Sequence, residues 1–325
     1  MSPFRTGSLT FSAASVVPIV SIIIVSYNVA AIMRDCLLSI AKETTAAHEI
    51  IIVDNASTDD SCAMVEREFP QVRLIRNEEN QGFAKANNQG LREAKGEFVL
   101  FLNPDTVILN SAIDRMLDFL RPRQELGVIG PHTFNADGIT TQATALRHPT
   151  LLRAFHAYIP LWRLVPVWQP ALLGEYVPAS SGAVEIVKGS CMLMRTQLAR
   201  EIGGMNELYF MYSEEIDLCE AVRGRGLAVY YYSEASIIHL GGASTEAVSD
   251  AMTVHLHRSM KKFFARAYHD SFPALQALRG ILFFGSLWRL SVWKCLELLG
   301  IKAEEARSKQ GNHKALLRWL AREYS

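Results

Sequence analysis

The feature that most constrains the fold of this chain is a regular alternation of apolar runs and helical segments over its first 130 residues. The first run, at 19–25, is continuous and β-branched, as expected of a strand buried on both faces. Strand, helix, strand, helix at this spacing predicts βαβ units. We therefore expect an α/β fold with a Rossmann-like, mostly parallel central sheet flanked by helices. The expected strands are 19–25, 49–53, 72–75 and 98–102, and the expected helices are 30–42, 57–69 (with Ser57 as N-cap) and 82–95, the last stopped by Gly96.

The alternation is lost between residues 132 and 185, where Pro, Thr and aromatic residues are frequent, and we interpret this segment as a variable insertion beside the site. The pattern then returns, with strands expected at 184–187, 191–194, 228–232 and 236–239 and helices at 213–225 and 252–268. The predicted organisation is an N-terminal extension at 1–18, an α/β domain at 19–250 that contains the insertion, and a helical C-terminal region at 251–325.

The charge of the chain is balanced overall but not along its length. Lys and Arg number 33, as do Asp and Glu, which gives no reason to expect nucleic acid as a partner. Residues 251–325 nevertheless carry 13 basic and 5 acidic residues, leaving 20 and 28 in the rest. The longest uncharged piece there, 280–288, is too short to cross a bilayer. The apolar residues of the stretch 275–301 recur at helical spacing. This basic, amphipathic region therefore either lies in a membrane interface or packs on the core.

Polar residues stand directly after three of the expected strands: Ser26, Tyr27 and Asn28; Asp54 and Asn55; Asn103, Pro104 and Asp105. Ligands of open α/β sheets bind beyond the carboxyl ends of the strands, so these residues mark the expected site. The sequence has neither GxxxxGK[ST] nor a GxGxxG after the first strand, which weighs against kinases and ordinary dinucleotide enzymes. The absence of GxSxG disfavours a serine hydrolase. Asp54 could bind a base or ribose, or serve as a turn aspartate.

Two residues at strand ends could hold a metal ion. Asp105 presents an isolated carboxylate, which suits Mg²⁺ or Mn²⁺ because these cations prefer oxygen ligands. His239 ends a later strand, and its imidazole could complete a Mn²⁺ site or serve as a hydrogen-bonded structural histidine.

Glu214, Glu215 and Asp217 begin an expected helix directly after an aromatic stretch at 209–212. The helix dipole favours acids in the first turn, which is one explanation of the cluster. Aromatic surroundings also raise the pKa of a carboxyl, so that one of the three could act as a general base. Glu214 and Asp217 share a helix face while Glu215 points elsewhere.

Seven stretches extend this pattern along residues 20 to 269: VSYN at 25–28, VDNASTDDS at 53–61, NEENQGFAKANNQG at 77–90, FLNPDT at 101–106, KGSCMLMR at 188–195, GGMNELYFMYSEEIDLCEAVRGRG at 203–226 and HLGGAST at 239–245. In this order they resemble glycosyltransferase family 2, whose fold is GT-A. Within the family, the sequences NPD and GGAS look most like bacterial rhamnosyltransferases of surface-polysaccharide synthesis.

The resemblance implies roles for individual residues. Nucleotide and donor-sugar contacts fall on Ser26, Tyr27, Asn28, Asp54, Asn55, Gly82, Phe83, Ala86, Asn87 and Asn103, with Asp54 on the pyrimidine base. Asp105 stands in the metal-binding DxD motif and His239 meets the metal or the diphosphate. Asn103 replaces the first Asp of that motif. Glu215 takes the place of the catalytic carboxylate, commonly Asp, and the base remains open between Glu214, Glu215 and Asp217.

The implied activity is inverting, metal-dependent (Mg²⁺ or Mn²⁺) transfer of a sugar from a nucleotide-diphosphate donor. The resemblance favours dTDP-rhamnose as donor, with UDP-hexoses next, and a glycan or lipid-linked glycan as acceptor. We expect a cytoplasmic enzyme at the inner face of the membrane, since five cysteines without a CxxC pair fit a reducing compartment. A nucleotidyltransferase would need a basic Gly-rich loop after the first strand. A catalytically inactive sugar-nucleotide binding protein would be expected to lack the acidic cluster.

Overall fold

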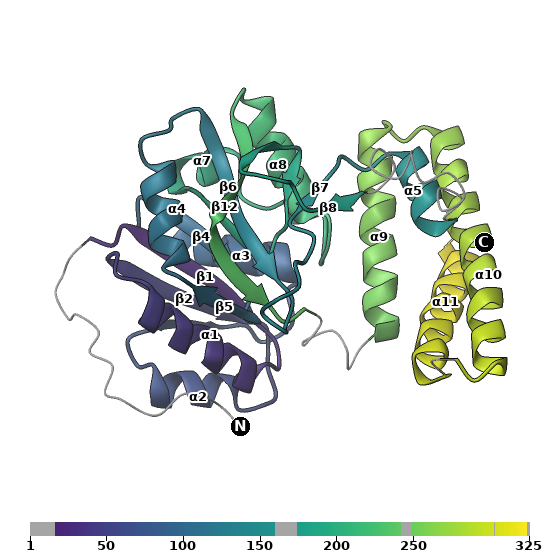
Figure 1. Cartoon of the computed structure of the whole chain (residues 1–325), viewed down its shortest axis with the longest axis horizontal. Coiled ribbons are helices and arrows are strands. Elements are labelled where there is room, and N and C mark those ends of the chain that lie inside the picture. Colours follow the sequence, from purple (N-terminus) through teal and green to yellow (C-terminus); the bar gives the residue numbers. More distant parts are fainter. Residues whose placement is uncertain (1–16, 160–173, 242–248, 302, 324–325) are drawn as a thin grey trace.

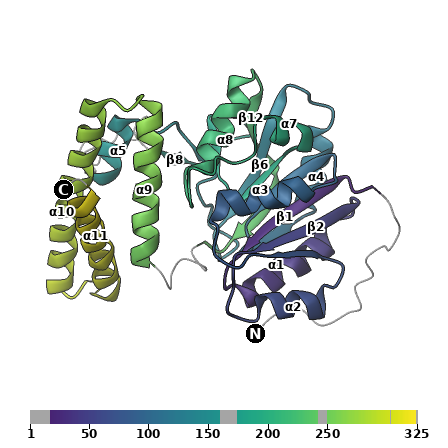
Figure 2. The same cartoon turned by 180° about the vertical axis from the view of Figure 1, so that it is seen from behind.

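The computed structural model describes residues 17–159, 174–241, 249–301 and 303–323. These residues form an α/β body and a group of helices that stands beside it (Figure 1). The view from behind shows the same arrangement, with the α9 helix between the body and the outer helices (Figure 2). The expected extension at 1–18 and the Gly-Ala-Ser part of the HLGGAST stretch fall mostly outside the described residues. The proposed division into domains therefore stays a prediction.

The body is built on a nine-stranded sheet that confirms the expected α/β architecture. Along the sheet the order is β3 (Arg73–Arg76), β2 (His48–Asp54), β1 (Val20–Ser26), β4 (Phe98–Leu102), β11 (Cys191–Arg195), β6 (Leu126–Phe134), β12 (Ala228–His239) and β5 (Thr106–Leu109), with β9 (Gly182–Val184) also on β12. Only β5, β9 and β11 run against the others, so the sheet is mostly parallel in direction.

Helices cover both faces of this sheet. The α1 (Ala30–Glu43), α2 (Ser61–Glu68) and α4 (Ala112–Leu120) helices share one core cluster with Ile22 and Ile24 of β1. The α3 (Phe83–Glu93), α7 (Thr196–Glu201) and α8 (Glu214–Gly224) helices lie on the other face, where Ile23 belongs to a second cluster with residues of all three. Because β1 feeds both clusters, its apolar run is continuous rather than alternating.

The remaining elements connect the body to the helices beside it. The strands β7 (Ala145–Leu146), β8 (Glu175–Tyr176) and β10 (Ile186–Val187) form a small second sheet. The helical unit consists of α5 (Leu151–Tyr158), α9 (Ser249–Ala267), α10 (Phe272–Leu298) and α11 (Ala303–Glu323). Its α5 comes from the middle of the sequence and packs on α10, where Gly285 meets Tyr158. No helix of the described residues has the length and apolarity needed to cross a membrane.

Several element boundaries differ from the sequence-based expectation. The α2 helix begins at Ser61 rather than Ser57, because the Ser57 hydroxyl donates to Asp54 instead of capping a helix. The α3 helix ends at Glu93, and Gly96 serves a close approach to the backbone of Ser21. The single strand expected at 184–187 is divided between β9 and β10, which belong to different sheets.

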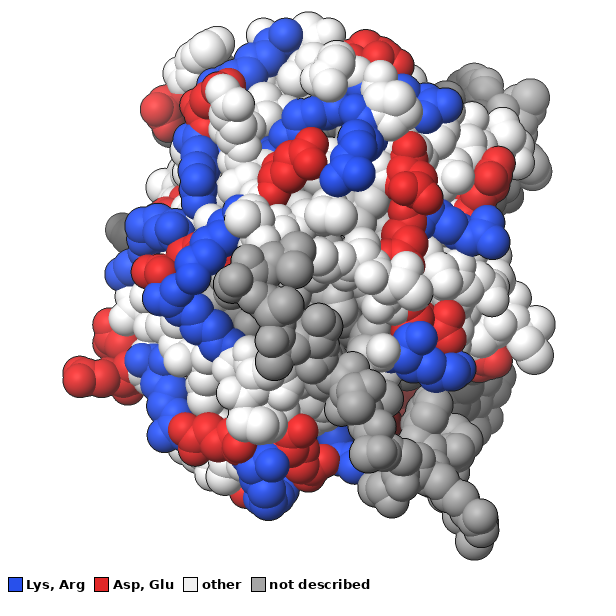
Figure 3. All heavy atoms as spheres, turned by 90° about the vertical axis from the view of Figure 1, so that its left-hand side faces the viewer, with Lys and Arg blue, Asp and Glu red and all other residues white. Residues whose placement is uncertain are grey.

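The expected strands 228–232 and 236–239 are one strand, β12, whose register shifts between Tyr232 and Ser236. The β5, α4 and β6 elements were not predicted. On the face of the body that lies opposite the helical unit, Lys and Arg alternate with Asp and Glu (Figure 3). That face offers no broad basic patch to nucleic acid.

Candidate active site

The predicted polar strand ends meet at one edge of the sheet. Since β1, β2, β4 and β12 run in the same direction, their carboxyl ends lie together. The antiparallel β11 begins at this edge, and the backbone amide of Asn103 donates to the backbone carbonyl of Ser190 across 2.9 Å. Two cavities open here, which we call the strand-end cavity and the helix-side cavity.

The strand-end cavity has a volume of about 430 Å³. Predicted residues from all four strand ends line it, namely Tyr27, Asn55, Asn103, Asp105 and His239, together with Gly82 and Phe83 at the start of α3. Its opposite wall comes from Phe210 and His255, whose rings stack with centroids 4.4 Å apart. An elongated polar ligand with a flat ring would find both polar strand ends and an aromatic surface here.

The helix-side cavity, of about 500 Å³, adjoins it. Glu214 and Glu215 line it, and α9 supplies an apolar wall through Leu256, Met260 and Phe263. The two cavities share the residues Phe83, Asn103, Met211, Tyr212 and His239. The carboxylates of α8 and the strand-end groups therefore face adjoining spaces.

The other predicted donor residues support the strand-end loops and do not line these cavities. Asp54 accepts both the backbone amide and the hydroxyl of Ser57, at 2.9 and 2.6 Å, as a turn aspartate does, and its contact with a base stays a prediction. The side-chain oxygen of Asn28 accepts the Thr58 amide at 2.7 Å. Ser26, Ala86 and Asn87 are buried in the sheet or in α3.

Gly82 is required by the shape of the loop before α3. Its φ is +84°, and a Cβ there would lie 2.5 Å from the carbonyl oxygen of Phe210. That same oxygen accepts the Phe83 amide at 2.7 Å, which ties the loop to the 209–212 segment. The side-chain amide of Asn55 donates to the Gly82 carbonyl at 3.2 Å. A residue with a side chain would push these two walls of the strand-end cavity apart.

Asp105 and His239 lie together as the sequence suggested. Nε2 of His239 is 3.3 Å from Oδ1 of Asp105, while Nδ1 is 2.8 Å from Oε1 of Gln142. An imidazole that donates from Nδ1 to Gln142 directs the lone pair of Nε2 towards the Asp105 carboxylate. Asn103 lies beside them, and its buried Oδ1 receives no hydrogen bond from the described residues. The side-chain nitrogen of Asn103 lies 3.3 Å from Nε2 of His239, so the carboxylate of Asp105 and the imidazole of His239 are the two groups here that fit a divalent cation.

The two glutamates of α8 are held by an unusual local backbone. Tyr212 and Ser213, the residues before the helix, have φ of 70° and 77°, and non-glycine residues in this region are strained. Burial raises the pKa of the Glu214 carboxyl well above its usual range, and Glu215 beside it raises it further. Burial also raises the pKa of Glu215. The chain approaches Glu215 closely at Gly189, where a Cβ would lie 3.4 Å from that of Glu215.

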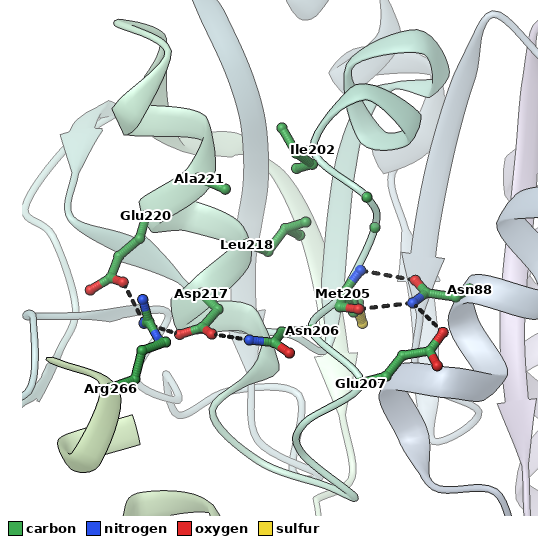
Figure 4. Close-up of a pocket in the computed structure, with 12 residues that line it drawn as sticks. Asn88, Ile202, Met205, Asn206, Glu207, Asp217, Leu218, Glu220, Ala221 and Arg266 are labelled. Carbon is green, nitrogen blue, oxygen red and sulfur yellow. Dashed lines mark hydrogen bonds and ion pairs between the residues drawn. The ribbon is translucent and has the colours of Figure 1, made fainter. Parts of the chain in front are cut away.

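Asp217 takes no part in either cavity. Arg266 of α9 donates to it, and Asn206 donates to its other oxygen at 2.7 Å (Figure 4). These groups line a third cavity, of about 560 Å³. The structure thus brings Glu214 and Glu215 to the site and uses Asp217 to anchor α9 to the body.

Sequence reasoning did not single out several groups at the site. Gln142, which orients His239, lies in the segment without periodicity, so no pattern announced it. Lys188, Arg147 and Arg153 line the helix-side cavity from loops and from α5. Lys188 belongs to the KGSCMLMR stretch and could have been noticed there. The two arginines carry no local signal.

The sheet, open at its carboxyl edge into two adjoining cavities, places the protein in the GT-A class of glycosyltransferases. A mannosyltransferase structure from Pyrobaculum calidifontis, in complex with GDP-Man and Mn²⁺, matches 96% of this chain and 89% of that one with a TM-score of 0.56 and 17% identity. At that identity the likeness shows the fold alone. The sequence profile of glycosyl transferase family 2 matches residues 21–202. The chain belongs to this family and is a glycosyltransferase.

Curated relatives have similar sequences over most of the chain. A Mycobacterium tuberculosis protein named N-acetylglucosaminyl-diphospho-decaprenol L-rhamnosyltransferase is 28% identical over 279 residues, 81% of this chain and 90% of that protein. A low-salt glycan biosynthesis hexosyltransferase of Haloferax volcanii is 27% identical over 223 residues, 67% of this chain and 66% of that protein. The predicted family, and the resemblance to rhamnosyltransferases, are thereby confirmed.

Proposed function

We propose that this protein is an inverting glycosyltransferase that moves a sugar from a nucleotide diphosphate to an acceptor hydroxyl, with Glu215 as general base. The observation that carries the proposal is the shared wall between the cavities. It sets the Asn103, Asp105 and His239 cluster on one side and the α8 glutamates on the other. A donor in the strand-end cavity would present its sugar to an acceptor in the helix-side cavity.

The strand-end cluster is the proposed site for Mg²⁺ or Mn²⁺. Asp105, His239 and the amide oxygen of Asn103 would hold the ion, and the buried, unpaired Oδ1 of Asn103 supports this choice. When bound, the ion would neutralise charge that grows on the departing diphosphate. Gln142 keeps the imidazole turned so that Nε2 faces the cluster. With one carboxylate instead of two, the site binds the ion less tightly than a DxD motif would.

The proposed roles of Glu214 and Glu215 differ because the two carboxyl groups differ in protonation state. Glu214 is the more buried of the two, and its Oε2 receives no hydrogen bond from the described residues, so the neutral acid is favoured there. A neutral Glu214 leaves Glu215 ionised as the base. Glu215 removes the acceptor proton, the acceptor oxygen forms a bond to the anomeric carbon, and the bond to the diphosphate breaks with its electron pair leaving on oxygen. Displacement from the opposite side inverts the anomeric centre.

The donor and acceptor are proposed from the relatives. The mycobacterial protein is named as an L-rhamnosyltransferase acting on a diphospho-decaprenol-linked sugar. We infer that dTDP-rhamnose is the first donor to test, with UDP-hexoses next. We infer also that the acceptor is a lipid-linked glycan in the synthesis of a cell-surface polysaccharide. The apolar α9 wall of the helix-side cavity supports an acceptor with a hydrocarbon part.

The proposed location is the inner face of the cytoplasmic membrane, reached through the helical unit. On α10, Phe284, Trp288 and Val292 are exposed and four residues apart, so they form one apolar face. The surrounding region, 251–325, holds 13 basic residues against 5 acidic ones. An exposed apolar face in a basic region fits an anionic lipid surface.

A donor panel tests the proposed function directly. We expect purified protein to release the nucleotide diphosphate from one of dTDP-rhamnose, UDP-glucose, UDP-galactose or UDP-N-acetylglucosamine when Mn²⁺ or Mg²⁺ and a lipid-linked acceptor are present. Chelation should abolish the release and added Mn²⁺ should restore it. Tight nucleotide-sugar binding without turnover on any acceptor would instead favour the inactive binding protein.

A further inference from the structure

Three cationic side chains gather on one side of the helix-side cavity, away from the strand-end cluster. Arg147 follows β7, Arg153 lies in α5 and Lys188 follows β10. They come from the small second sheet and the helix after it, which are separate from the strand ends of the central sheet. The predicted nucleotide contacts are not among them. The cavity thus has a cationic edge of its own.

The hydrogen bonds of these cations leave donors available to a ligand. Nε of Arg147 is buried and donates to no acceptor among the described residues. The nearest acid to this guanidinium, Glu185, is 4.0 Å away, and the guanidinium lies over the ring of Tyr176 at 4.8 Å. Arg153 donates from Nη1 to the carbonyl of His148 at 2.6 Å. Lys188 donates to Glu175, which also lines the cavity, at 3.0 Å, so the available donors belong to the two arginines. A buried donor without an acceptor is unfavourable, and an anionic ligand would supply the missing acceptor.

The remaining walls of the cavity specify what else such a ligand would carry. The α9 side chains Leu256, Met260 and Phe263 offer apolar surface, and Glu215 lines the same space. Lys188 lies close enough to Glu215 to lower the pKa of its carboxyl, against the larger effect of burial. A ligand that satisfies all three walls has a hydroxyl, an anionic group and a hydrocarbon chain, with the anion between the other two.

We propose that Arg147, Arg153 and Lys188 bind the diphosphate of a prenyl-diphosphate-linked acceptor, whose sugar reaches Glu215 and whose first prenyl units lie along α9. This inference rests on the proposed transferase function and assigns its acceptor subsite. Two guanidinium groups beside an ammonium group suit phosphate, because guanidinium forms paired hydrogen bonds with its oxygens. Glu175 offsets the charge of Lys188, so the two guanidinium groups give this edge its net positive charge, which neutral sugar hydroxyls would not require.

The test compares two synthetic acceptors on the full-length enzyme. One carries N-acetylglucosamine on a short prenyl diphosphate, and the other is an octyl glycoside of the same sugar without phosphate. We expect R147M and R153M each to raise KM for the diphosphate acceptor about tenfold or more. The donor KM and the turnover of the octyl glycoside should stay within about twofold of wild type. R147K should recover part of the loss, and R92M, on an exposed part of α3, should change nothing.

A second measurement separates this inference from the proposed function. With the nucleotide site saturated by nucleotide diphosphate, farnesyl diphosphate should bind the wild type at least about tenfold more tightly than farnesol. R147M should remove most of that difference. This holds whether or not a transferred sugar has been found. The acceptor subsite is wrong if wild-type enzyme treats both acceptors alike, if the arginine variants slow both equally, or if farnesyl diphosphate binds the variants as it binds wild type.

Discussion

The two adjacent carboxyl groups of the helix-side cavity are proposed to have different roles. Glu214 and Glu215 are neighbours in sequence and both line the helix-side cavity. Burial raises the pKa of each, and the charge of Glu215 adds to the increase at Glu214. Two neighbouring carboxylates repel each other, which favours a state with one proton on the pair. Because Glu214 is the more enclosed, the proton belongs there and the charge on Glu215.

This division predicts unequal effects of two matched substitutions. Glu215→Gln removes the base and should lower kcat by about 10²–10⁴-fold, with nucleotide affinity close to wild type. Glu214→Gln replaces a neutral acid with a neutral amide of similar shape and should cost no more than about tenfold. Steady-state kinetics and nucleotide titration of both variants give the comparison. If Glu214→Gln were the more damaging change, the roles assigned to the two residues would be reversed.

The base assignment also predicts a pH dependence. The pKa of Glu215 is raised from 4.5 by burial, and only the ionised carboxylate accepts a proton. Activity should therefore fall as pH is lowered towards that raised pKa, with the midpoint above about 4.5. A pH profile of kcat at saturating donor and acceptor measures it. A midpoint at or below the usual value for Glu would contradict a buried base.

Asn103 sets the strength of the proposed cation site. Its side-chain amide lies beside His239, with the nitrogen 3.3 Å from Nε2, and supplies no charge. Asn103→Asp adds a second carboxylate, so the Mn²⁺ concentration at half-saturation should fall about tenfold, as affinity rises with ligand charge. Electron paramagnetic resonance of free Mn²⁺ gives that value independently of turnover. Asn110→Asp, at an exposed residue directly after β5, serves as the control. Unchanged Mn²⁺ affinity in Asn103→Asp would remove Asn103 from the site.

At the scale of elements, the loop before α3 shows how backbone shape builds a cavity wall. Gly82→Ala should destabilise the protein by about 1–3 kcal/mol, because an alanine at φ +84° is strained and its Cβ meets Phe210. The displaced 209–212 segment should also raise the donor KM. Gly203→Ala is a matched control, since Gly203 has the same φ with no atom within 4 Å. Equal losses in both variants, by chemical denaturation, would show that conformation rather than contact matters.

The core strands could be predicted from sequence and the site only in part. The strands β1, β2 and β4 can be predicted because a strand buried on both faces has a continuous apolar run. Short edge elements such as β5 carry too few residues for a period to show. Asn103 was noticed from its position after a strand, whereas Glu215 was singled out from Glu214 and Asp217 only by the resemblance to family 2. Gln142 and Arg147 could not be found, because only the folded chain brings them to the cavity.

The helical unit contains a buried histidine that couples its stability to pH. His257 contacts Tyr158 through Nε2, and Nδ1 lies 2.6 Å from the carbonyl oxygen of Thr253, so the neutral ring is fully paired. Burial lowers the pKa of His257 from 6.5 to about 4. Between these values the unfolded chain binds a proton that the folded chain does not. Stability should therefore fall as pH decreases from 6.5 to about 4, by up to about 3 kcal/mol from this residue.

Denaturation followed by circular dichroism at several pH values measures this coupling. His257→Phe should be less stable at pH 7, since Tyr158 loses its partner, but should show a shallower fall in acid. A shallower slope rather than a flat one is expected, because burial also lowers the pKa of His313 to about 4. A variant with the slope of wild type would show that His257 does not carry the effect.

At the scale of the whole molecule, charge and apolar surface are divided between two parts. The first 250 residues have an excess of acid, and residues 251–325 have an excess of base that nearly all lies in the helical unit. The same unit supplies the α9 wall of the helix-side cavity and the exposed face of α10. Ser259 and Lys262 of α9 donate to the carbonyls of Met211 and Leu208, which ties the unit to the body beside the site. A surface bound by α10 would therefore lie at a fixed position relative to the cavity that we propose for the acceptor.

This arrangement predicts that the membrane contact depends on α10 and on salt. Wild-type protein should sediment with vesicles containing anionic lipid at low salt and dissociate as salt is raised, because each basic residue near the surface contributes about 1 kcal/mol. Replacing Phe284 and Trp288 with Asp should weaken binding about tenfold or more, since two exposed aromatic side chains then no longer enter the interface. Ile139→Asp, at an apolar residue of the body that is more exposed than either, should leave binding unchanged. Failure of wild type to bind anionic vesicles, or binding by the α10 variant equal to wild type, would mean that the acceptor is reached without this surface.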